Sequence, residues 1–224
     1  MSHVHSPHSG SDNLDMFTQE FWDARYRSAD RNWSGNPNPH LVAHVADLSP
    51  GTALDVGCGE GADAIWLASL GWQVTAIDVS TVALDRAAEQ AAAAGKDVAD
   101  RITWQQADVL SGDFMKAAPQ FDLVSAQFMH LPRLERESLV RRLAAAVRPG
   151  GTLLIVGHHP SDLETTVGRP NLPDLFFTAE EVAAALHPDD WRIIVAAAPE
   201  RQTLDRNGQP VTIRDAVMRA IRRE

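Results

Sequence analysis

The stretch Ala53-Leu-Asp-Val-Gly-Cys-Gly-Glu-Gly-Ala-Asp-Ala-Ile-Trp-Leu-Ala68 predicts a buried strand, a glycine-rich loop and the beginning of a helix. Residues 53–56 are apolar apart from one aspartate, and they lie between a Ser-Pro-Gly turn and Gly57. From about Gly61 onward, apolar residues recur at helical spacing. The glycines of the loop tolerate positive φ and have no Cβ that would hold a ligand away from the backbone. We therefore expect the floor of a pocket for a nucleotide-like ligand here.

The glycine spacing does not identify that ligand by itself, because Gly57-x-Gly59-x-x-Ala62 also satisfies the relaxed fingerprint of dinucleotide-binding proteins. Two aspartates narrow the choice. Asp55 lies two residues before the first glycine, at the end of the first strand. Asp78 ends a second apolar strand, where a carboxylate can accept hydrogen bonds from the hydroxyl groups of a ribose.

A third strand, residues 102–105, runs into Ala107-Asp108-Val109. With this segment the chain resembles the class I S-adenosylmethionine-dependent methyltransferases over roughly residues 15–160. The run Leu-Asp-Val-Gly-Cys-Gly-Glu-Gly looks like the first motif of that family. Asp78 looks like its second-strand acid, and Ala107-Asp108-Val109 looks like its adenine-side segment. The three pieces are specific as a set.

The resemblance implies that the chain binds S-adenosylmethionine and releases S-adenosylhomocysteine. It assigns the ribose hydroxyls to Asp78, whose charge would strengthen the hydrogen bonds. It assigns the ammonium of the methionine end to Asp55, and the adenine to Asp108 and the Val109 amide. The expected cofactor-binding residues are Tyr26, Trp33, Asp55, Gly57, Cys58, Gly59, Asp78, Val79, Ala107, Asp108, Val109 and Gln127.

Three of these residues have plainer interpretations that the sequence leaves open. Asp78 could serve merely as a cap for the helix that begins near Ser80, and Asp108 could belong to an ordinary surface turn. Cys58 is expected to be a small residue tolerated beside the ligand rather than a nucleophile, because no partnered His or Asn motif points to it. No metal site is expected.

The segment before the first strand, residues 14–48, is expected to cap the site. Its Trp-Asp-x-Arg-Tyr and Trp-Ser-Gly pieces resemble the small-molecule methyltransferases related to the tellurite-resistance and thiopurine types. The resemblance implies that Tyr26 and Trp33 close over the cofactor. The alternative is that these rings pack only on the body of the protein, because aromatic side chains are costly to leave in water.

Methyl transfer is an in-line displacement at carbon, so the protein acts chiefly by positioning the two reactants. A general base is needed only if the acceptor must lose a proton before it attacks. His130 follows the fourth strand and His158 follows the fifth, at the edge where ligands bind in open α/β sheets. We take both as candidate general bases. A purely structural role for each histidine remains an equal alternative.

Strands alternate with helices up to about residue 160, which predicts a doubly wound, Rossmann-like α/β sheet. We expect seven strands, mostly parallel, with a C-terminal antiparallel hairpin formed by residues 192–198 and 211–218 around Asn207-Gly208. Composition would also allow a helix over residues 213–221. The expected organisation is a disordered, histidine-containing tail at residues 1–13 followed by one methyltransferase domain at residues 14–224.

Composition limits the partners. The formal net charge of −10 argues against broad binding to nucleic acid or to anionic membranes. The single cysteine excludes an internal disulfide framework and suits a reducing compartment. No apolar run approaches the ~20 residues of a membrane span, and no signal peptide is recognisable. We expect a soluble cytoplasmic enzyme with a small-molecule methyl acceptor; the sequence leaves the oligomeric state open.

Two other functions remain open. The first is an NAD(P)-dependent reductase that uses the same glycine turn. Asp55, the Ala107-Asp108-Val109 segment and the missing Tyr-x-x-x-Lys constellation of reductases argue against it. The second is a protein that binds S-adenosylmethionine but transfers no methyl group.

Overall fold

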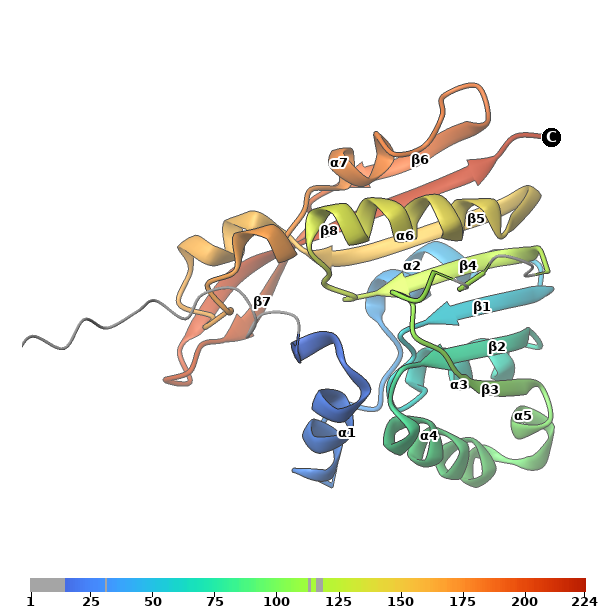
Figure 1. Cartoon of the computed structure of the whole chain (residues 1–224), viewed down its shortest axis with the longest axis horizontal. Coiled ribbons are helices and arrows are strands. Elements are labelled where there is room, and N and C mark those ends of the chain that lie inside the picture. Colours follow the sequence, from blue (N-terminus) through green and yellow to red (C-terminus); the bar gives the residue numbers. More distant parts are fainter. Residues whose placement is uncertain (1–14, 31, 113, 116–118) are drawn as a thin grey trace, which may run out of the picture.

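The computed structural model describes residues 15–30, 32–112, 114–115 and 119–224. The predicted tail at residues 1–13 lies outside the described residues. Figure 1 shows one twisted central sheet with helices packed against it.

The sheet has eight strands in the order β3-β2-β1-β4-β5-β8-β6, with β7 paired to β8 off this path. The strands are β1 Thr52–Val56, β2 Gln73–Asp78, β3 Ile102–Gln106, β4 Phe121–Gln127, β5 Val147–His158, β6 Trp191–Ala197, β7 Glu200–Leu204 and β8 Pro210–Arg222. Strands β1 to β5 pair in parallel, and β8 is antiparallel to both β5 and β6. The predicted Rossmann-like α/β fold with a mostly parallel sheet is confirmed.

The C-terminal part differs in detail from the predicted hairpin. The turn at Asn207-Gly208 joins β7 to β8, so the sheet has eight strands where seven were expected. Pro199 separates β6 from β7, because proline has no amide hydrogen with which to continue a strand ladder. Residues 213–221 lie within β8 and are not helical.

Helix ends follow their local signals closely. The α-helices are α1 Gln19–Arg27, α2 Pro39–Val45, α3 Ala62–Ser69, α4 Thr81–Ala94, α5 Lys96–Ala99, α6 Arg133–Ala145 and α7 Ala179–Ala183, and the short 3-10 turns are η1 Asp15–Phe17, η2 Pro160–Glu164 and η3 Pro173–Leu175. The Ser80 hydroxyl caps α4 and Gly95 ends it. Thr178 and Glu181 form a capping box at the start of α7.

Two apolar cores lie on opposite faces of the sheet. Alternate residues of a strand point to opposite faces, so Leu54 of β1 joins one core while the preceding Ala53 joins the other. The first core contains the buried side of α6, including Leu143, and the second contains Leu41 of α2 and Leu67 of α3. The sheet is therefore covered on both faces, as parallel sheets usually are.

The C-terminal ends of the parallel strands meet along one edge, and α1 docks beside it. Asp23 of α1 is buried and accepts a hydrogen bond of 2.6 Å from the Ser80 hydroxyl and one of 3.3 Å from the Val82 amide. The carboxylate thus sits at the positive N-terminal end of α4. This contact anchors α1 at Ser80, two residues after Asp78 in the chain.

Within the described residues, the helices are all too short or too polar to cross a membrane.

We predict that Gly157→Ala destabilises the fold. A Cβ at this position of β5 would overlap the ring of Phe177, which is 1% exposed. Overpacking a core costs ~1–3 kcal/mol, so the free energy of unfolding in urea should fall by about that amount. Gly112→Ala is the matched control, because among the described residues beyond its chain neighbours no atom lies within 4 Å of its added Cβ. Equal stability of the two variants would contradict the prediction.

Candidate active site

The loop after β1 turns back onto β2 through its glycines. Gly57 and Gly59 have φ values of 71° and 53°, a region that side chains with a Cβ rarely adopt. The amides of Gly57 and Cys58 both donate to the Ile77 carbonyl, at 2.9 Å each. The backbone of the loop is therefore fixed against the end of β2.

Side chains from distant parts of the chain cover this loop. A Cβ added to Gly57 would lie 2.8 Å from the sulfur of Met129, and one added to Gly59 would lie 2.9 Å from the hydroxyl of Tyr26. The indole nitrogen of Trp33 donates to the Tyr26 hydroxyl at 3.2 Å. A ligand lying along Gly57 would require the Met129 side chain to move, and methionine is flexible enough to do so.

Glu60, inside the loop, holds the covering segment in place. Its buried carboxylate accepts hydrogen bonds from the amides of Asn32 and Trp33, at 3.2 and 3.3 Å. It also pairs with Arg86 of α4 at 3.0 Å. Glu60 was not among the predicted site residues. The available signal was a charged residue between two glycines of a bare loop.

Asp55 is the least satisfied carboxylate of the site. It is 2% exposed, and its Oδ2 atom has no hydrogen-bond partner among the described residues. Burial, together with the nearby Asp63 and Asp78, raises the pKa of Asp55 well above its ordinary value. Such an oxygen fits a cationic group such as an ammonium, because a buried carboxylate is stable when it is paired.

Asp63, in the first turn of α3, joins Asp55 beside the loop. It accepts a hydrogen bond of 2.6 Å from the amide of Asn38, the residue that caps α2. Burial raises the pKa of Asp63 to about 6. Asp63 was not among the predicted site residues.

Asp78 lies at the tip of β2 and is 9% exposed. Its Oδ2 accepts from the Gly59 amide at 2.8 Å, and its Oδ1 accepts from the Ser80 amide at 2.9 Å. Burial raises the pKa of Asp78, although these hydrogen bonds oppose the rise. Each oxygen retains capacity for a further hydrogen bond, so a structural role near Ser80 and a role toward a ribose are compatible.

The predicted adenine-side residues lie next to the end of β2. The Ala107 amide donates to the Asp78 carbonyl at 3.0 Å, and the Val79 carbonyl accepts from Gln106 at 3.4 Å. Asp108 is exposed, and its Oδ1 accepts from the Leu110 amide at 2.8 Å, as in an ordinary Asx turn. The role of Asp108 toward adenine stays a prediction.

Two further expected residues occupy the same edge. Gln127 ends β4, and its Oε1 atom is buried without a hydrogen-bond partner in the described part of the chain. Burial, with the charges of Asp55 and Asp78, raises the pKa of the Cys58 thiol well above its ordinary value. The thiol is therefore protonated and poorly nucleophilic, in keeping with a residue that only lines the loop.

The structure brings His130 and His158 together as a stacked pair, with ring centroids 4.6 Å apart. The Nε2 atom of His130 accepts from the His158 amide at 3.0 Å, and burial lowers the pKa of His130 to about 3. The Nδ1 atom of His158 lies 3.0 Å from a nitrogen of Arg169, and burial lowers the pKa of His158. Both rings already use a lone pair, so their role as general bases stays a prediction that requires these bonds to open.

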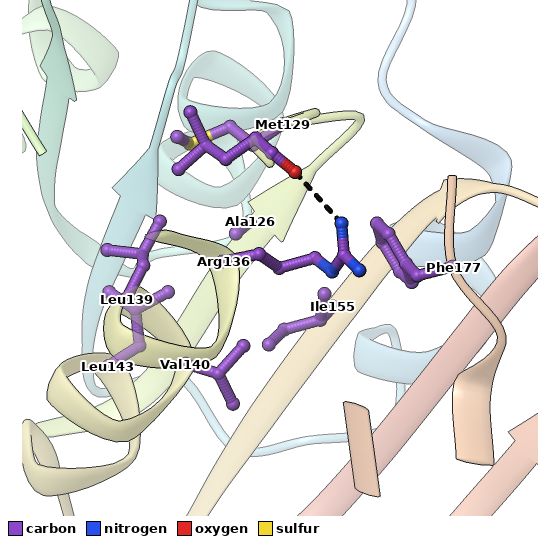
Figure 2. A pocket seen from close by; sticks show the side chains of 9 residues that line it. Ala126, Met129, Arg136, Leu139, Val140, Leu143, Ile155 and Phe177 are labelled. Atoms are coloured by element: carbon purple, nitrogen blue, oxygen red, sulfur yellow. Dashed lines mark hydrogen bonds between the residues drawn. The ribbon is translucent and has the colours of Figure 1, made fainter. Parts of the chain in front are cut away.

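A small apolar cavity of about 20 Å³ lies next to Met129, lined also by Ile155 and Phe177. Figure 2 shows the Arg136 side chain extending toward Phe177 in this region. Arg136 donates to the Leu131 carbonyl at 2.8 Å. The cavity has room for about one water molecule and is far too small for a nucleotide.

We predict that Asp63→Asn reduces the pH dependence of stability. The ordinary pKa is 3.8 and the folded value is about 6, so the folded state binds more protons between these pH values. Stability contributed by this group is therefore lost as the pH rises from about 4 to about 6. Urea unfolding of the wild type should show a steeper fall across this window than the variant, whose side chain can still accept from Asn38. Asp97→Asn, exposed on α5, is the control and should keep the wild-type slope; equal slopes in all three proteins would refute the assignment.

Known proteins that resemble this chain are methyltransferases. Residues 53–151 match the family described as "Methyltransferase domain". Over 105 residues the chain is 36% identical to 27-O-demethylrifamycin SV methyltransferase of Amycolatopsis mediterranei, covering 46% of this chain and 36% of the relative. Over 115 residues it is 33% identical to ribosomal RNA small subunit methyltransferase C of Alcanivorax borkumensis, covering 49% of this chain and 33% of the relative. The chain thus spans about a third of the length of these relatives.

Solved structures share the fold over nearly the whole chain. One of them comes from work on the conversion of a disulfide bond into a thioacetal group during echinomycin biosynthesis. It superposes on this chain with a TM-score of 0.71 and 22% identity, covering 92% of this chain and 91% of the other. Magnesium protoporphyrin IX methyltransferase from Synechocystis, with bound S-adenosylhomocysteine, gives a TM-score of 0.66 and 19% identity, covering 94% and 97%. Residues 53–151 therefore match the methyltransferase domain family, and the chain has the fold of these solved structures.

Proposed function

We propose that the chain transfers a methyl group from S-adenosylmethionine to a small-molecule acceptor through oxygen, nitrogen or sulfur. One observation carries the proposal: the buried carboxylates of Asp55 and Asp78 and the half-buried carboxylate of Asp63 lie around the glycine loop. A donor with a sulfonium and an ammonium suits such an acidic floor. The pyrophosphate of a dinucleotide would instead meet Asp63 in the first turn of α3, where like charges repel.

Each residue at the loop has a distinct proposed role. Asp55 would hold the ammonium of the methionine end through its unpartnered oxygen, and Asp78 would accept from the ribose hydroxyls. Asp108 and Val109 would flank the adenine. The Tyr26 and Trp33 pair would cover the ligand from the opposite side of Gly59.

The chemistry places modest demands on the protein. Bound S-adenosylmethionine supplies an activated methyl group on a sulfonium. The chain's own residues then have to align the acceptor opposite that carbon and exclude water, and alignment of this kind can be worth effective molarities of ~10⁵–10⁸ M. The cover formed by Met129, Tyr26 and Trp33 is suited to excluding water from the loop.

The names of the matched relatives indicate two different classes of methyl acceptor. The rifamycin relative is named for a small molecule, and the second relative is named for ribosomal RNA. The net charge of −10 favours the small molecule, because proteins that bind RNA usually present a basic surface. If the protein methylated ribosomal RNA and no small molecule, the acceptor would be an RNA and the small-molecule proposal would be wrong.

We predict that S-adenosylhomocysteine raises the melting temperature and that NADH does not. A ligand that binds only the folded state stabilises it by about 2.7 kcal/mol at a concentration of 100 Kd. The measurement is thermal unfolding with each compound at equal concentration. A shift with NADH alone would favour the reductase. A shift with S-adenosylhomocysteine without turnover on a broad acceptor panel would favour the non-catalytic binder.

We predict that Asp78→Ala weakens S-adenosylhomocysteine binding at least tenfold by calorimetry. Hydrogen bonds to a charged group contribute ~1.5–3 kcal/mol, and a tenfold change corresponds to about 1.4 kcal/mol. Asp78→Asn is the second variant if the alanine variant does not fold, since its amide oxygen still accepts from the loop. Asp85→Ala, exposed on α4, should bind as the wild type does. Unchanged affinity in both Asp78 variants would remove the assignment.

A further inference from the structure

A second buried carboxylate cluster lies where β5 ends and β8 begins. Asp215 of β8 pairs in register with His158 and is fully buried. Its Oδ2 accepts from Nε of Arg201 at 2.6 Å and contacts Nε2 of His40 at 3.1 Å. Its Oδ1 is buried without a hydrogen-bond partner among the described residues, and the nearest histidine nitrogen, Nδ1 of His158, is 3.7 Å away.

Two sets of contacts link this cluster to the surroundings of the glycine loop. The ring of His158 lies 4.7 Å from that of Phe128, the residue after β4, and Phe128 packs in the same core cluster as Cys58. Phe128 has a φ of 54°, a strained value for a residue with a Cβ. The beginning of α2 provides a second link, because Asn38 donates to Asp63 and His40, two residues later, contacts Asp215.

The two histidines beside Asp215 have partners of opposite charge, and these partners leave opposite hydrogen-bonding groups free on the two rings. An ionised carboxylate can only accept, so Asp215 fixes His40 with its proton on Nε2 and its lone pair on Nδ1. A guanidinium can only donate, so Arg169 fixes His158 with its lone pair on Nδ1 and its proton on Nε2. Each orientation follows from the charge of the partner.

Both polarising partners are held firmly. Arg169 donates through Nε and Nη2 to one oxygen of Asp162, at 3.1 Å each, and Asp162 is 1% exposed. Burial by itself would raise the pKa of Asp215, but its polar surroundings, including the hydrogen bonds to His40 and Arg201, lower it far below its ordinary value. Asp215 therefore remains a carboxylate that can fix the ring of His40.

We propose that His40 is the general base of the methyl transfer, positioned by Asp215, and that His158 donates a hydrogen bond to the same acceptor. The proposal rests on the proposed function. It specifies the acceptor as a hydroxyl or amine with a hydrogen-bond-accepting oxygen close by, since one histidine offers a lone pair and the other offers an N–H. The side chain of His40 is 17% exposed, so a small molecule can reach it.

The step balances as follows. The O–H or N–H bond of the acceptor breaks, and its proton passes to Nδ1 of His40. The freed electron pair forms the bond to the methyl carbon. The carbon–sulfur bond breaks, and its electron pair remains on sulfur, giving S-adenosylhomocysteine. The positive charge of the sulfonium is thereby replaced by the charge of protonated His40, beside Asp215.

The first test needs no knowledge of the acceptor. In protein labelled with ¹⁵N at histidine and saturated with S-adenosylhomocysteine, long-range ¹H–¹⁵N spectra report which ring nitrogen carries the proton. We expect the Nε2–H tautomer for His40 in the wild type and a mixture of tautomers in Asp215→Asn. An Nδ1–H tautomer of His40 in the wild type, or no change in Asp215→Asn, would overturn the proposal.

The second test separates base catalysis from structural support. Catechol keeps its protons at neutral pH and has adjacent oxygens, whereas 4-nitrothiophenol is already ionised and needs no base. We expect His40→Gln to lower kcat for catechol by ~10²–10⁴-fold and to leave the rate with the thiolate within about threefold. His44→Gln, one turn further along α2, is the control and should leave both rates unchanged. Equal losses with the two acceptors, or none, would overturn the proposal.

The proposed function and the base assignment can fail separately. A wild type that binds S-adenosylhomocysteine but methylates neither probe nor any member of a wider panel counts against the proposed function. The tautomer of His40 still decides the base assignment in that case. Calorimetry with S-adenosylhomocysteine on His40→Gln should give the wild-type affinity, because the cluster lies outside the proposed cofactor contacts.

Discussion

The burial of several carboxylates around one glycine loop is the constraint on which the site depends. A buried carboxylate is costly unless hydrogen bonds or a cation compensate it. Asp78 is compensated by the amides of Gly59 and Ser80, and Asp63 by the amide of Asn38. Asp55 keeps one oxygen without a partner in the described residues. The loop can approach these groups because Gly57 and Gly59 adopt positive φ, and the uncompensated charge that remains favours a cationic ligand.

The same logic extends along the strand edge to β5 and β8, with a different result. Around Asp215 the partners are side chains from α2 and β7, so the carboxylate stays ionised and polarises His40. Around the glycine loop the partners are mostly backbone amides, and burial raises the pKa of Asp55. One edge of the sheet therefore holds an acidic floor suited to a cation. Beside it lie two histidines, of which His40 leaves a lone pair free and His158 leaves an N–H free.

The secondary structure was predictable wherever a few neighbouring residues decide it. The cap of α4 at Ser80 and the capping box of α7 depend only on residues within one helical turn. The strand β7 was missed because its residues alternate in exposure without an apolar face and follow Pro199. Its pairing is supplied by β8 and not by its own sequence.

By itself, the sequence determined the strand, loop and helix around the glycines and the positions of Asp55 and Asp78 at strand ends, because these depend on local backbone chemistry. Only the tertiary structure decided that Met129 covers Gly57 and that His40 meets Asp215, 175 positions later in the chain. Such contacts form because the sheet order brings β8 next to β5 and because α2 packs against the sheet. Neither arrangement leaves a periodic signal in the residues concerned.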